Sequence, residues 1–465
     1  MKNQSIDLVI EGGKLVTHHE LLDVDLAIDN GRVVGLGKAS HFPTPAKVIH
    51  AEGKFVLPGA IDCHVHFRDP GFPQREDFQS GTSAAAAGGI TTVIDMPNTA
   101  PSVWNAQVFR EKRDSVKGRA VVDYALYACA GTDSVHEIAS LAKEGAVAFK
   151  TLMTNVPPRG REQEFYGIHL KSDSDILDVM EAVAKTGLTH TFHAETDCIV
   201  QREVGRLQKK GRMDALAHTE SRPNYVEADA IAHTIIVGHE FGDYVHVAHM
   251  STHEGVELVR QAKSRGFHVT SETCAHYLFL TRHDMKRLGT LAKIQPPLRE
   301  RRDQDSLWGG INDGTIDIIC SDHSPFTKAE KRRNIWRALP GAPDMENMIP
   351  LMLHAINLGK LSIPKLVEIS SRNVAKIFGL YPKKGALKVG SDADVIIVDM
   401  KAKRKIRADQ MHTKAKNNTI FEGWKVKGLP VMTIVRGEVV MEQGRIVGNR
   451  GHGDWQPRIS NRRAG

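Results

Sequence analysis

The sequence predicts an α/β fold: a (β/α)8 TIM barrel with a small β-sandwich domain built from both chain termini. Three observations support this prediction. Eight apolar segments of strand length alternate with helical patterns between residues 60 and 321, which is the repeat that a closed barrel of parallel strands requires. Short alternating segments separated by turn residues occupy both ends of the chain. The length of 465 residues suits a barrel-sized domain and a second unit.

Both ends of the chain carry the turn-rich pattern of a small β domain. Asn30-Gly31, between two apolar segments, is typical of a tight hairpin turn. Segments of the same kind return near the C-terminus, at 393–398 and 432–440. The expected domains are the N-terminal part of the small domain (1–55), the catalytic barrel (56–384), and the C-terminal part of the small domain with a tail (385–465).

The middle of the chain supplies the barrel strands as short continuous apolar runs, the pattern of strands buried on both faces. A doubly wound open sheet is the alternative, but no GxGxxG motif follows the first strand to indicate a dinucleotide site. The predicted strands are 60–66, 91–96, 121–128, 146–152, 188–193, 244–249, 267–272 and 316–321. Helices are expected between them, for example at 76–88, 173–187, 226–241 and 253–265.

Composition favours a cytoplasmic protein. No apolar run approaches the roughly 20 residues of a membrane span, and no secretory h-region follows Met1. The net charge is +7, but the basic clusters at 328–337 and 401–407 lack the interleaved aromatic residues of a nucleic-acid binder. We therefore expect no membrane and no nucleic-acid partner. An odd number of scattered cysteines without a CxxC pair favours reduced thiols: Cys63, Cys129, Cys198, Cys274 and Cys320.

The pair His64-Val65-His66 is the first candidate for a functional site. Two histidines at i and i+2 of an extended segment point to the same side of the strand. The apolar residues from Phe55 to Ile61 that precede them resemble a buried strand, so both imidazoles would emerge at its end. Neutral imidazole is the commonest metal ligand among side chains, although two polar residues alternating on a half-buried strand are also common.

Ionisable residues end most of the other predicted strands too. Active sites of such barrels lie at the carboxyl ends of the strands, where these side chains would converge. A catalytic zinc takes about three protein ligands, so four histidines and an aspartate could supply two metals only if a bridging anionic ligand joined them. Taken singly, each histidine has an ordinary structural explanation, and Lys150 is explained by an acidic neighbour. The strand-end residues are His64, His66, Asp95, Asn98, Lys150, His193, Glu195, His249, Glu272, Asp322 and His323.

Eight motifs together resemble the cyclic amidohydrolases, the group of dihydroorotase, allantoinase, hydantoinase and dihydropyrimidinase. The resemblance spans essentially the whole chain, including the return into the terminal sheet at 390–399. The motifs are GAIDCHVHFRDPG (59–71), AAAAGGITTVIDMPNT (84–99), FKTLM (149–153), FHAE (192–195), HVAHMS (246–251), ETCAHYL (272–278), PPLRERRDQDSLW (296–308) and DIICSDHSPF (317–326). In combination the motifs are highly specific for the family, but much less specific for one of these four enzymes.

The resemblance implies an enzyme with two zinc ions per subunit. His64, His66 and Asp322 would hold one ion, His193 and His249 the other, and a carboxylated Lys150 would bridge them. It also implies attack of metal-activated water on the ring amide carbonyl, with Asp322 passing the proton to the leaving nitrogen. A homodimer or homotetramer is implied as well. A metal-free scaffold relative is the remaining alternative, which the intact ligand set disfavours.

Arg68 and Asn98 are the predicted substrate-binding residues. Arg68, two residues after His66, could pair with a ring carboxylate, and Asn98 could donate a further hydrogen bond. HxHFRDPG followed by MPNT resembles dihydroorotase most closely, which implies reversible interconversion of dihydroorotate and N-carbamoyl-aspartate. The alternative explanation of Arg68 is a salt bridge to Asp69 or Glu76 at the barrel rim.

Three departures favour a hydantoinase, a dihydropyrimidinase or an allantoinase instead. Phe326 replaces a histidine that commonly binds the carboxylate in dihydroorotases, and Gln295 replaces their usual asparagine. Lys150 at the bridging position, where bacterial dihydroorotases of this length often have an aspartate, also resembles the other members. Stereospecificity would depend on loops such as 153–171, a segment that carries no recognisable motif and could be a lid.

Overall fold

The predicted barrel is confirmed by the computed structural model, which describes residues 5–153 and 160–459. Eight strands form one sheet in chain order, and each is parallel to the next. The His66 amide donates to the His323 carbonyl at 2.8 Å, which joins the last strand to the first. The strands are β8 (Ala60–Val65), β9 (Ile90–Asp95), β10 (Asp123–Cys129), β11 (Ala148–Leu152), β12 (Thr189–His193), β13 (Tyr244–Val247), β14 (Val269–Cys274) and β15 (Ile318–Cys320).

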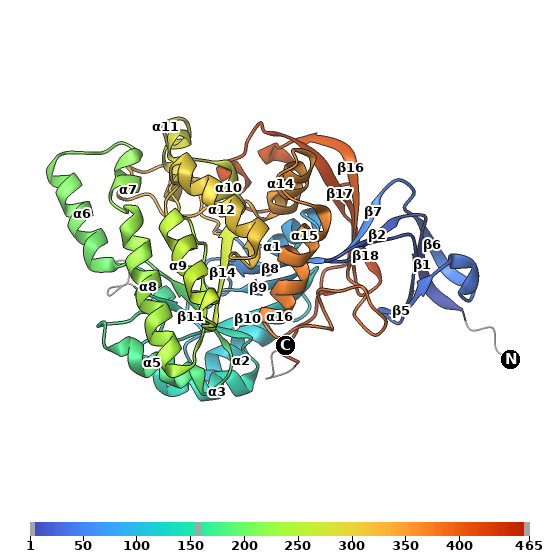
Figure 1. Cartoon of the computed structure of the whole chain (residues 1–465), viewed down its shortest axis with the longest axis horizontal. Coiled ribbons are helices and arrows are strands. Elements are labelled where there is room, and N and C mark those ends of the chain that lie inside the picture. Colours follow the sequence, from blue (N-terminus) through green and yellow to red (C-terminus); the bar gives the residue numbers. More distant parts are fainter. Residues whose placement is uncertain (1–4, 154–159, 460–465) are drawn as a thin grey trace.

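Helices cover the outside of the barrel (Figure 1). The main ones are α1 (Phe78–Ala87), α2 (Ala106–Val116), α3 (Ile138–Glu144), α5 (Asp175–Ala184), α8 (Asn224–Phe241), α9 (His253–Ser264), α12 (Arg301–Asp313) and α14 (Met345–Asn357). Further helices lie in the connections: α4 (Glu162–Phe165), α6 (Asp197–Lys209), α7 (Leu216–Glu220), α10 (Ala275–Phe279), α11 (Met285–Leu288), α13 (Lys328–Lys331), α15 (Ile363–Val367) and α16 (Asn373–Ile377). The four helices expected from the sequence are all present.

Two terminal sheets form the predicted β-sandwich. The larger joins both ends of the chain, because β7 pairs antiparallel with β16. Its order is β19 (Arg445–Ile446), β18 (Glu438–Glu442), β17 (Lys425–Val435), β16 (Val395–Lys405), β7 (Phe55–Pro58), β2 (Lys14–Val16) and β3 (Leu21–Leu22). The smaller uses N-terminal strands alone: β5 (Arg32–Gly37), β4 (Asp25–Asp29), β1 (Ile6–Glu11) and β6 (Pro45–His50). Asn30 and Gly31, both at positive φ, make the predicted hairpin turn between β4 and β5.

The two terminal sheets share a buried apolar core. Leu8 and Ile28 of the smaller sheet pack in one cluster with Val56, Ile397 and Ile434 of the larger. In Figure 1 the larger sheet lies between the barrel and the smaller one. The N-terminal strands are therefore held to the barrel through β16 and β17. The domain boundaries at 55/56 and 384/385 stay a prediction.

One sequence interpretation is wrong in detail: Phe55 to Ile61 do not form a single strand leading into the histidines. The chain divides at Gly59 into β7, which belongs to the terminal sheet, and β8, the first strand of the barrel. The Gly59 amide donates to the Asp394 carbonyl at 2.8 Å. A Cβ at position 59 would meet Thr91 Oγ1 at 2.1 Å, so the crossing between the two sheets requires glycine.

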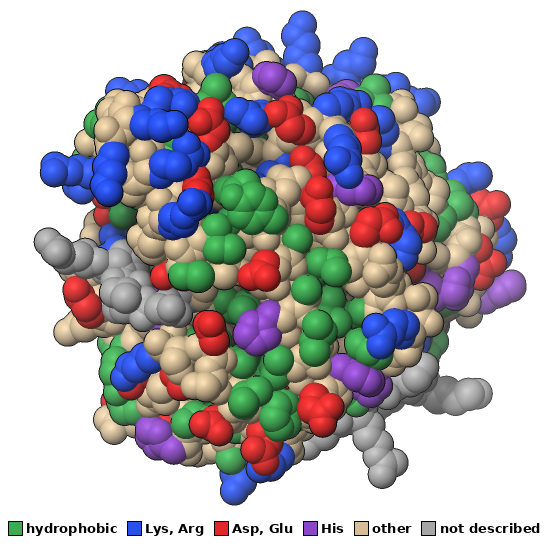
Figure 2. Space-filling model, turned by 60° about the vertical axis from the view of Figure 1, so that its left-hand side comes forward, with side chains coloured by type: hydrophobic (Ala, Val, Ile, Leu, Met, Phe, Trp, Pro, Cys, Tyr) green, Lys and Arg blue, Asp and Glu red, His purple; other side chains and the backbone are tan. Residues whose placement is uncertain are grey.

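Charged side chains are mixed on the face shown in Figure 2. Lysines and arginines gather at its upper edge, and acidic side chains lie among hydrophobic ones below. Among the described residues, no helix is both long and apolar enough to cross a membrane. Of the predicted lid, residues 154–159 lie outside the part of the chain that the structure describes.

Candidate metal centre

All six predicted metal ligands line one cavity at the carboxyl ends of the barrel strands, with a volume of about 730 Å³. His64 lies near the end of β8, Lys150 is in β11 and His193 ends β12. His249 and Asp322 follow β13 and β15 and have positive φ values, 36° and 46°. Such backbone strain is typical of functional sites, because the surrounding fold must hold it in place.

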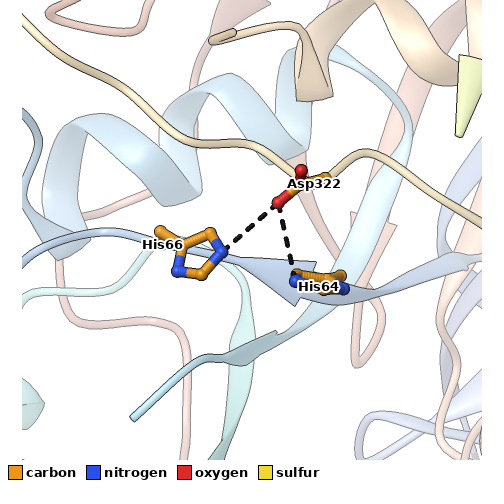
Figure 3. A group of neighbouring side chains, drawn as sticks. All are labelled: His64, His66 and Asp322. Atoms are coloured by element: carbon orange, nitrogen blue, oxygen red, sulfur yellow. Dashed lines mark ion pairs between the residues drawn. The ribbon is translucent and has the colours of Figure 1, made fainter. Parts of the chain in front are cut away.

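His64, His66 and Asp322 form the first group of candidate ligands (Figure 3). Asp322 Oδ1 lies 3.5 Å from His64 Nε2 and 3.3 Å from His66 Nε2. The three atoms face a common point, as the alternation along β8 predicted. Two imidazole nitrogens and a carboxylate oxygen are ligands that suit zinc.

His193 and His249 form the second group. His193 Nδ1 lies 3.0 Å from His249 Nε2, so both nitrogens face one point. Burial lowers the pKa of both imidazoles, and lowers that of His249 strongly. Since a metal binds the neutral form of imidazole, these low pKa values favour ligation at neutral pH.

Lys150 carries a buried amine without a hydrogen-bond partner in the described structure. Burial lowers the pKa of Lys150 to about 8, although the Glu272 and Asp322 carboxylates oppose the shift. A neutral amine is the form that reacts with carbon dioxide. An orphaned amine near five candidate ligands therefore fits the predicted carbamate, which would supply two bridging oxygens. The alternative explanation, an ion pair with an acidic neighbour, has no support among the described contacts.

Polar partners fix which nitrogen of three histidines faces the cavity. His64 Nδ1 forms a short hydrogen bond with Glu272 Oε1, and His66 Nδ1 lies 2.8 Å from Asn98 Oδ1. His193 Nε2 lies 2.9 Å from Glu195 Oε2. Such partners typically set the tautomer of ligating histidines and raise their basicity.

Two residues of the first ligand group, His64 and Asp322, have raised pKa values. Burial lowers the pKa of His64, but Glu272 and Asp322 outweigh burial and raise it to about 10. A metal bound at His64 would therefore have to displace a proton. Burial raises the pKa of Asp322 to about 6, which is suitable for a general acid and base near neutrality.

The two predicted substrate residues line the cavity, but both have partners within the protein. Arg68 Nη1 donates to Glu164 Oε1 at 2.6 Å and Nη2 to Ser324 Oγ at 2.8 Å. The proposed rim partners Asp69 and Glu76 are not those that Arg68 uses. The Asn98 oxygen is engaged by His66, so its substrate role stays a prediction.

Some residues of this site had no role assigned from the sequence. The sequence places Glu272 and Glu195 at strand ends but does not predict that they are partners of ligating histidines. Glu164 lies in the four-residue helix α4, within a polar stretch that carries no motif. Its burial and its side-chain contacts distinguish it from the exposed Glu162 of the same helix.

Comparison with known proteins identifies the family. The model of the amidohydrolase family matches residues 55–440. The chain belongs to the amidohydrolase family. It is 34% identical to an L-hydantoinase from Paenarthrobacter aurescens over 457 residues, which cover 97% of this chain and 98% of the relative. It is also 34% identical over 456 residues to a dihydroorotase from Methanosarcina mazei, with 97% of each chain covered.

A solved structure supports the fold of this amidohydrolase. The L-hydantoinase (dihydropyrimidinase) from Arthrobacter aurescens superposes with a TM-score of 0.93 at 34% identity, covering 97% of this chain and all of that one. This amidohydrolase is therefore a hydrolase of cyclic amides. The family commonly uses a binuclear metal site, and the ligand groups above are candidates for it.

Proposed function

We propose that this amidohydrolase opens the ring C–N bond of a neutral, 5-substituted hydantoin with two zinc ions as cofactor. The observation that carries the hydrolytic part is the convergence of two ligand groups beside the orphaned Lys150 amine. His64, His66 and Asp322 would hold one ion, and His193 and His249 the other. Carboxylated Lys150 would join them. The donor set of nitrogen and oxygen atoms fits zinc, and also manganese or cobalt.

Zinc bound there would supply Lewis-acid chemistry that polarises an amide carbonyl and activates water at neutral pH. Asp322 would take a proton from the attacking water and deliver it to the leaving ring nitrogen. A carboxylate beside the attacking water is positioned for both steps. Glu272, Asn98 and Glu195 would keep His64, His66 and His193 in the orientation that ligation needs.

The cavity supports a ring with an apolar substituent. Its volume of about 730 Å³ lies in the range of sites that enclose drug-sized ligands, well above the needs of a bare ring. Val200 and Val204 of α6 line it, as do Leu339 and Pro340 of the loop after α13. These side chains would contact an aliphatic or aromatic group at ring position 5.

Dihydroorotate is the second candidate substrate, as the opening motif of the barrel predicted. Arg68 lines the cavity, and a ring carboxylate needs such a partner. The pairing of Arg68 with Glu164 disfavours it. A dihydropyrimidine or allantoin would be a further neutral ring for the same cavity. A cytoplasmic homodimer or homotetramer stays a prediction.

Ring-opening kinetics test this proposal. Protein supplemented with zinc and bicarbonate would be given hydantoin, 5-benzylhydantoin, dihydrouracil, allantoin and dihydroorotate at equal concentrations. We expect the highest kcat/KM for 5-benzylhydantoin and loss of all activities after chelation. A highest kcat/KM for dihydroorotate would favour the second candidate. Failure to open any ring, with two zinc ions bound, would contradict the hydrolytic proposal.

A further inference from the structure

Three arginines surround one buried carboxylate beside the catalytic cavity. Glu164, which has no exposed surface, accepts from Arg68 Nη1 at 2.6 Å. Arg161 donates to it through Nε at 2.7 Å and through Nη2 at 2.5 Å. Arg75 Nη1 lies 3.6 Å away. Burial alone would raise the pKa of Glu164, but Arg68 and then Arg161 outweigh burial and lower it, so the group is a carboxylate at neutral pH.

The same three guanidinium groups lie over the buried ring of Phe326. Their Cζ atoms are 5.1 Å (Arg68), 5.2 Å (Arg75) and 5.6 Å (Arg161) from its centroid. Stacking on an aromatic face stabilises guanidinium groups. Three positive charges buried close together repel one another, however, and need neighbouring anions to balance them. Glu164 supplies one, and Glu330, which accepts from Arg75 at 2.7 Å, supplies the other.

The arginine cluster therefore has one positive charge more than these two carboxylates balance. Arg68 Nε is buried and makes no hydrogen bond to any described group. Arg68, Arg161 and Phe326 line the cavity together with His66, whereas Glu164 lies behind them. The Glu164 carboxylate therefore takes up guanidinium donors of two arginines that also line the cavity.

We propose that Glu164 is a specificity-determining residue of the hydrolase. Its carboxylate accepts from Arg68 Nη1, a donor that a carboxylate on the substrate ring would need, so neutral rings are favoured over dihydroorotate. A ring carboxylate could bind Arg68 only if Glu164 lost this partner and stayed buried. The cost of leaving Glu164 with fewer partners would cancel most of the binding free energy that the new contact supplies. Only the kinetic consequence of this inference rests on the proposed hydrolysis of ring amides; its consequence for ligand binding does not.

Ligand binding tests the inference without catalysis. Orotate and uracil share a planar ring and differ by the carboxylate, so both would be titrated calorimetrically into zinc-loaded wild type and Glu164→Gln. A charge-assisted hydrogen bond to a freed Arg68 predicts about tenfold tighter orotate binding in the variant. Uracil affinity should stay within about twofold. Adding Arg68→Gln to Glu164→Gln should remove the gain.

Matched variants guard against a folding defect. Glu162→Gln makes the same change at an exposed residue of α4 and should leave orotate affinity unaltered. Arg161→Gln with Glu164→Gln removes one charge of each sign, and should show the same gain if Glu164→Gln alone is unstable. Unchanged orotate affinity in a folded, zinc-loaded variant would overturn the inference.

Kinetics separate this inference from the proposed function. We expect the ratio of kcat/KM for dihydroorotate to that for 5-benzylhydantoin to rise about tenfold in Glu164→Gln, mainly through the KM of dihydroorotate. If wild type opens no ring, the proposed function fails, and the orotate titration still decides the role of Glu164. An equal loss on both substrates would show a merely structural role and reject the inference.

Discussion

Glu272 contacts two of the predicted metal ligands, His64 and His249. Its carboxylate accepts from His64 Nδ1, from the His249 amide at 3.2 Å, from His246 Nε2 at 3.2 Å and from Cys63 Sγ at 3.1 Å. Glu272→Gln replaces an acceptor oxygen by a donor and cannot serve all four groups. We predict about 10–100-fold weaker zinc binding, measured by competition with a chelator. Glu240→Gln on the surface of α8 is the control, and equal zinc affinity in both variants would contradict the prediction.

Two substitutions can decide whether Asn98 orients His66 or binds the substrate. Its oxygen lies 2.8 Å from His66 Nδ1. Asn98→Ala removes this acceptor, so we predict about tenfold weaker zinc binding and a lower kcat on every substrate. Asn98→Asp keeps an acceptor and should retain zinc. If Asn98 acts on the substrate instead, both variants will bind zinc normally and differ only in KM.

The ligands could be predicted from sequence because their positions follow from strand periodicity. His64 and His66 share a face through the alternation of β8, and parallel strands bring His193 and Asp322 to the same rim. The partners of these ligands could not be predicted. Whether Asn98 faces His66 or the substrate depends on side-chain direction across two strands, and Glu164 reaches Arg68 from a short helix that has no periodic pattern.

Among the elements, α13 fixes one wall of the cavity through a buried lysine. Lys331 Nζ donates to the carbonyls of Lys293 at 3.0 Å, Leu339 at 3.2 Å and Gly341 at 2.7 Å, and Leu339 and Gly341 line the cavity. We predict that Lys331→Met loosens this wall. Amide hydrogen exchange in 335–341 should become faster, and KM should rise about tenfold for 5-benzylhydantoin but little for hydantoin.

Lys328→Met is the matched control for this prediction, because Lys328 lies in the same helix but is exposed. It should leave both the exchange rates and KM unaltered. Equal effects of Lys331→Met on the two hydantoins would mean that the wall does not contact the ring substituent. Unaltered exchange would mean that the three carbonyl contacts do not hold it.

Helix α4 should contribute stability that depends on pH through Glu164. Its pKa is lowered in the folded protein from an ordinary value of 4.5. Its contribution is therefore complete above about pH 4.5 and is lost as pH falls through the lower folded value. We predict that Glu164→Gln lowers the urea midpoint at pH 7 and that the difference from wild type shrinks below pH 4.5. A difference that does not change between pH 7 and pH 3.5 would exclude the ion pairs as its cause.

At the scale of the whole molecule, the fold was predictable because each barrel strand is a local pattern. The eight strands all lie within a few residues of the predicted ranges. The division between barrel and sandwich was less predictable, since Phe55 to Ile61 is one apolar run, and its two strands separate at Gly59 because they pair in different sheets. How the terminal domain is attached also depends on contacts that the sequence does not reveal.

A buried lysine joins the barrel to the C-terminal part of the chain. Lys384 Nζ, 1% exposed, lies 2.5 Å from Asp123 at the start of β10 and 2.9 Å and 2.7 Å from Asp392 and Asp394, which precede β16. Gln456 of the C-terminal tail donates to the same Asp123 at 3.0 Å. The three carboxylates have the geometry of a cation site, and the Lys384 ammonium supplies that cation.

Removing this ammonium should therefore destabilise the whole molecule. Lys384→Met leaves three buried carboxylates with too few cations, and breaking a buried ion pair costs about 3–5 kcal/mol. We predict a clearly lower Tm for the zinc-loaded variant, with Lys388→Met at an exposed position nearby as the control. Asp392→Asn added to Lys384→Met removes one uncompensated charge and should restore part of the loss.

Since the site lies at the opposite end of β10 from the cavity, kcat of the folded variant should stay close to wild type. An unaltered Tm would mean that the Lys384 ion pairs do not contribute to the attachment of the terminal domain.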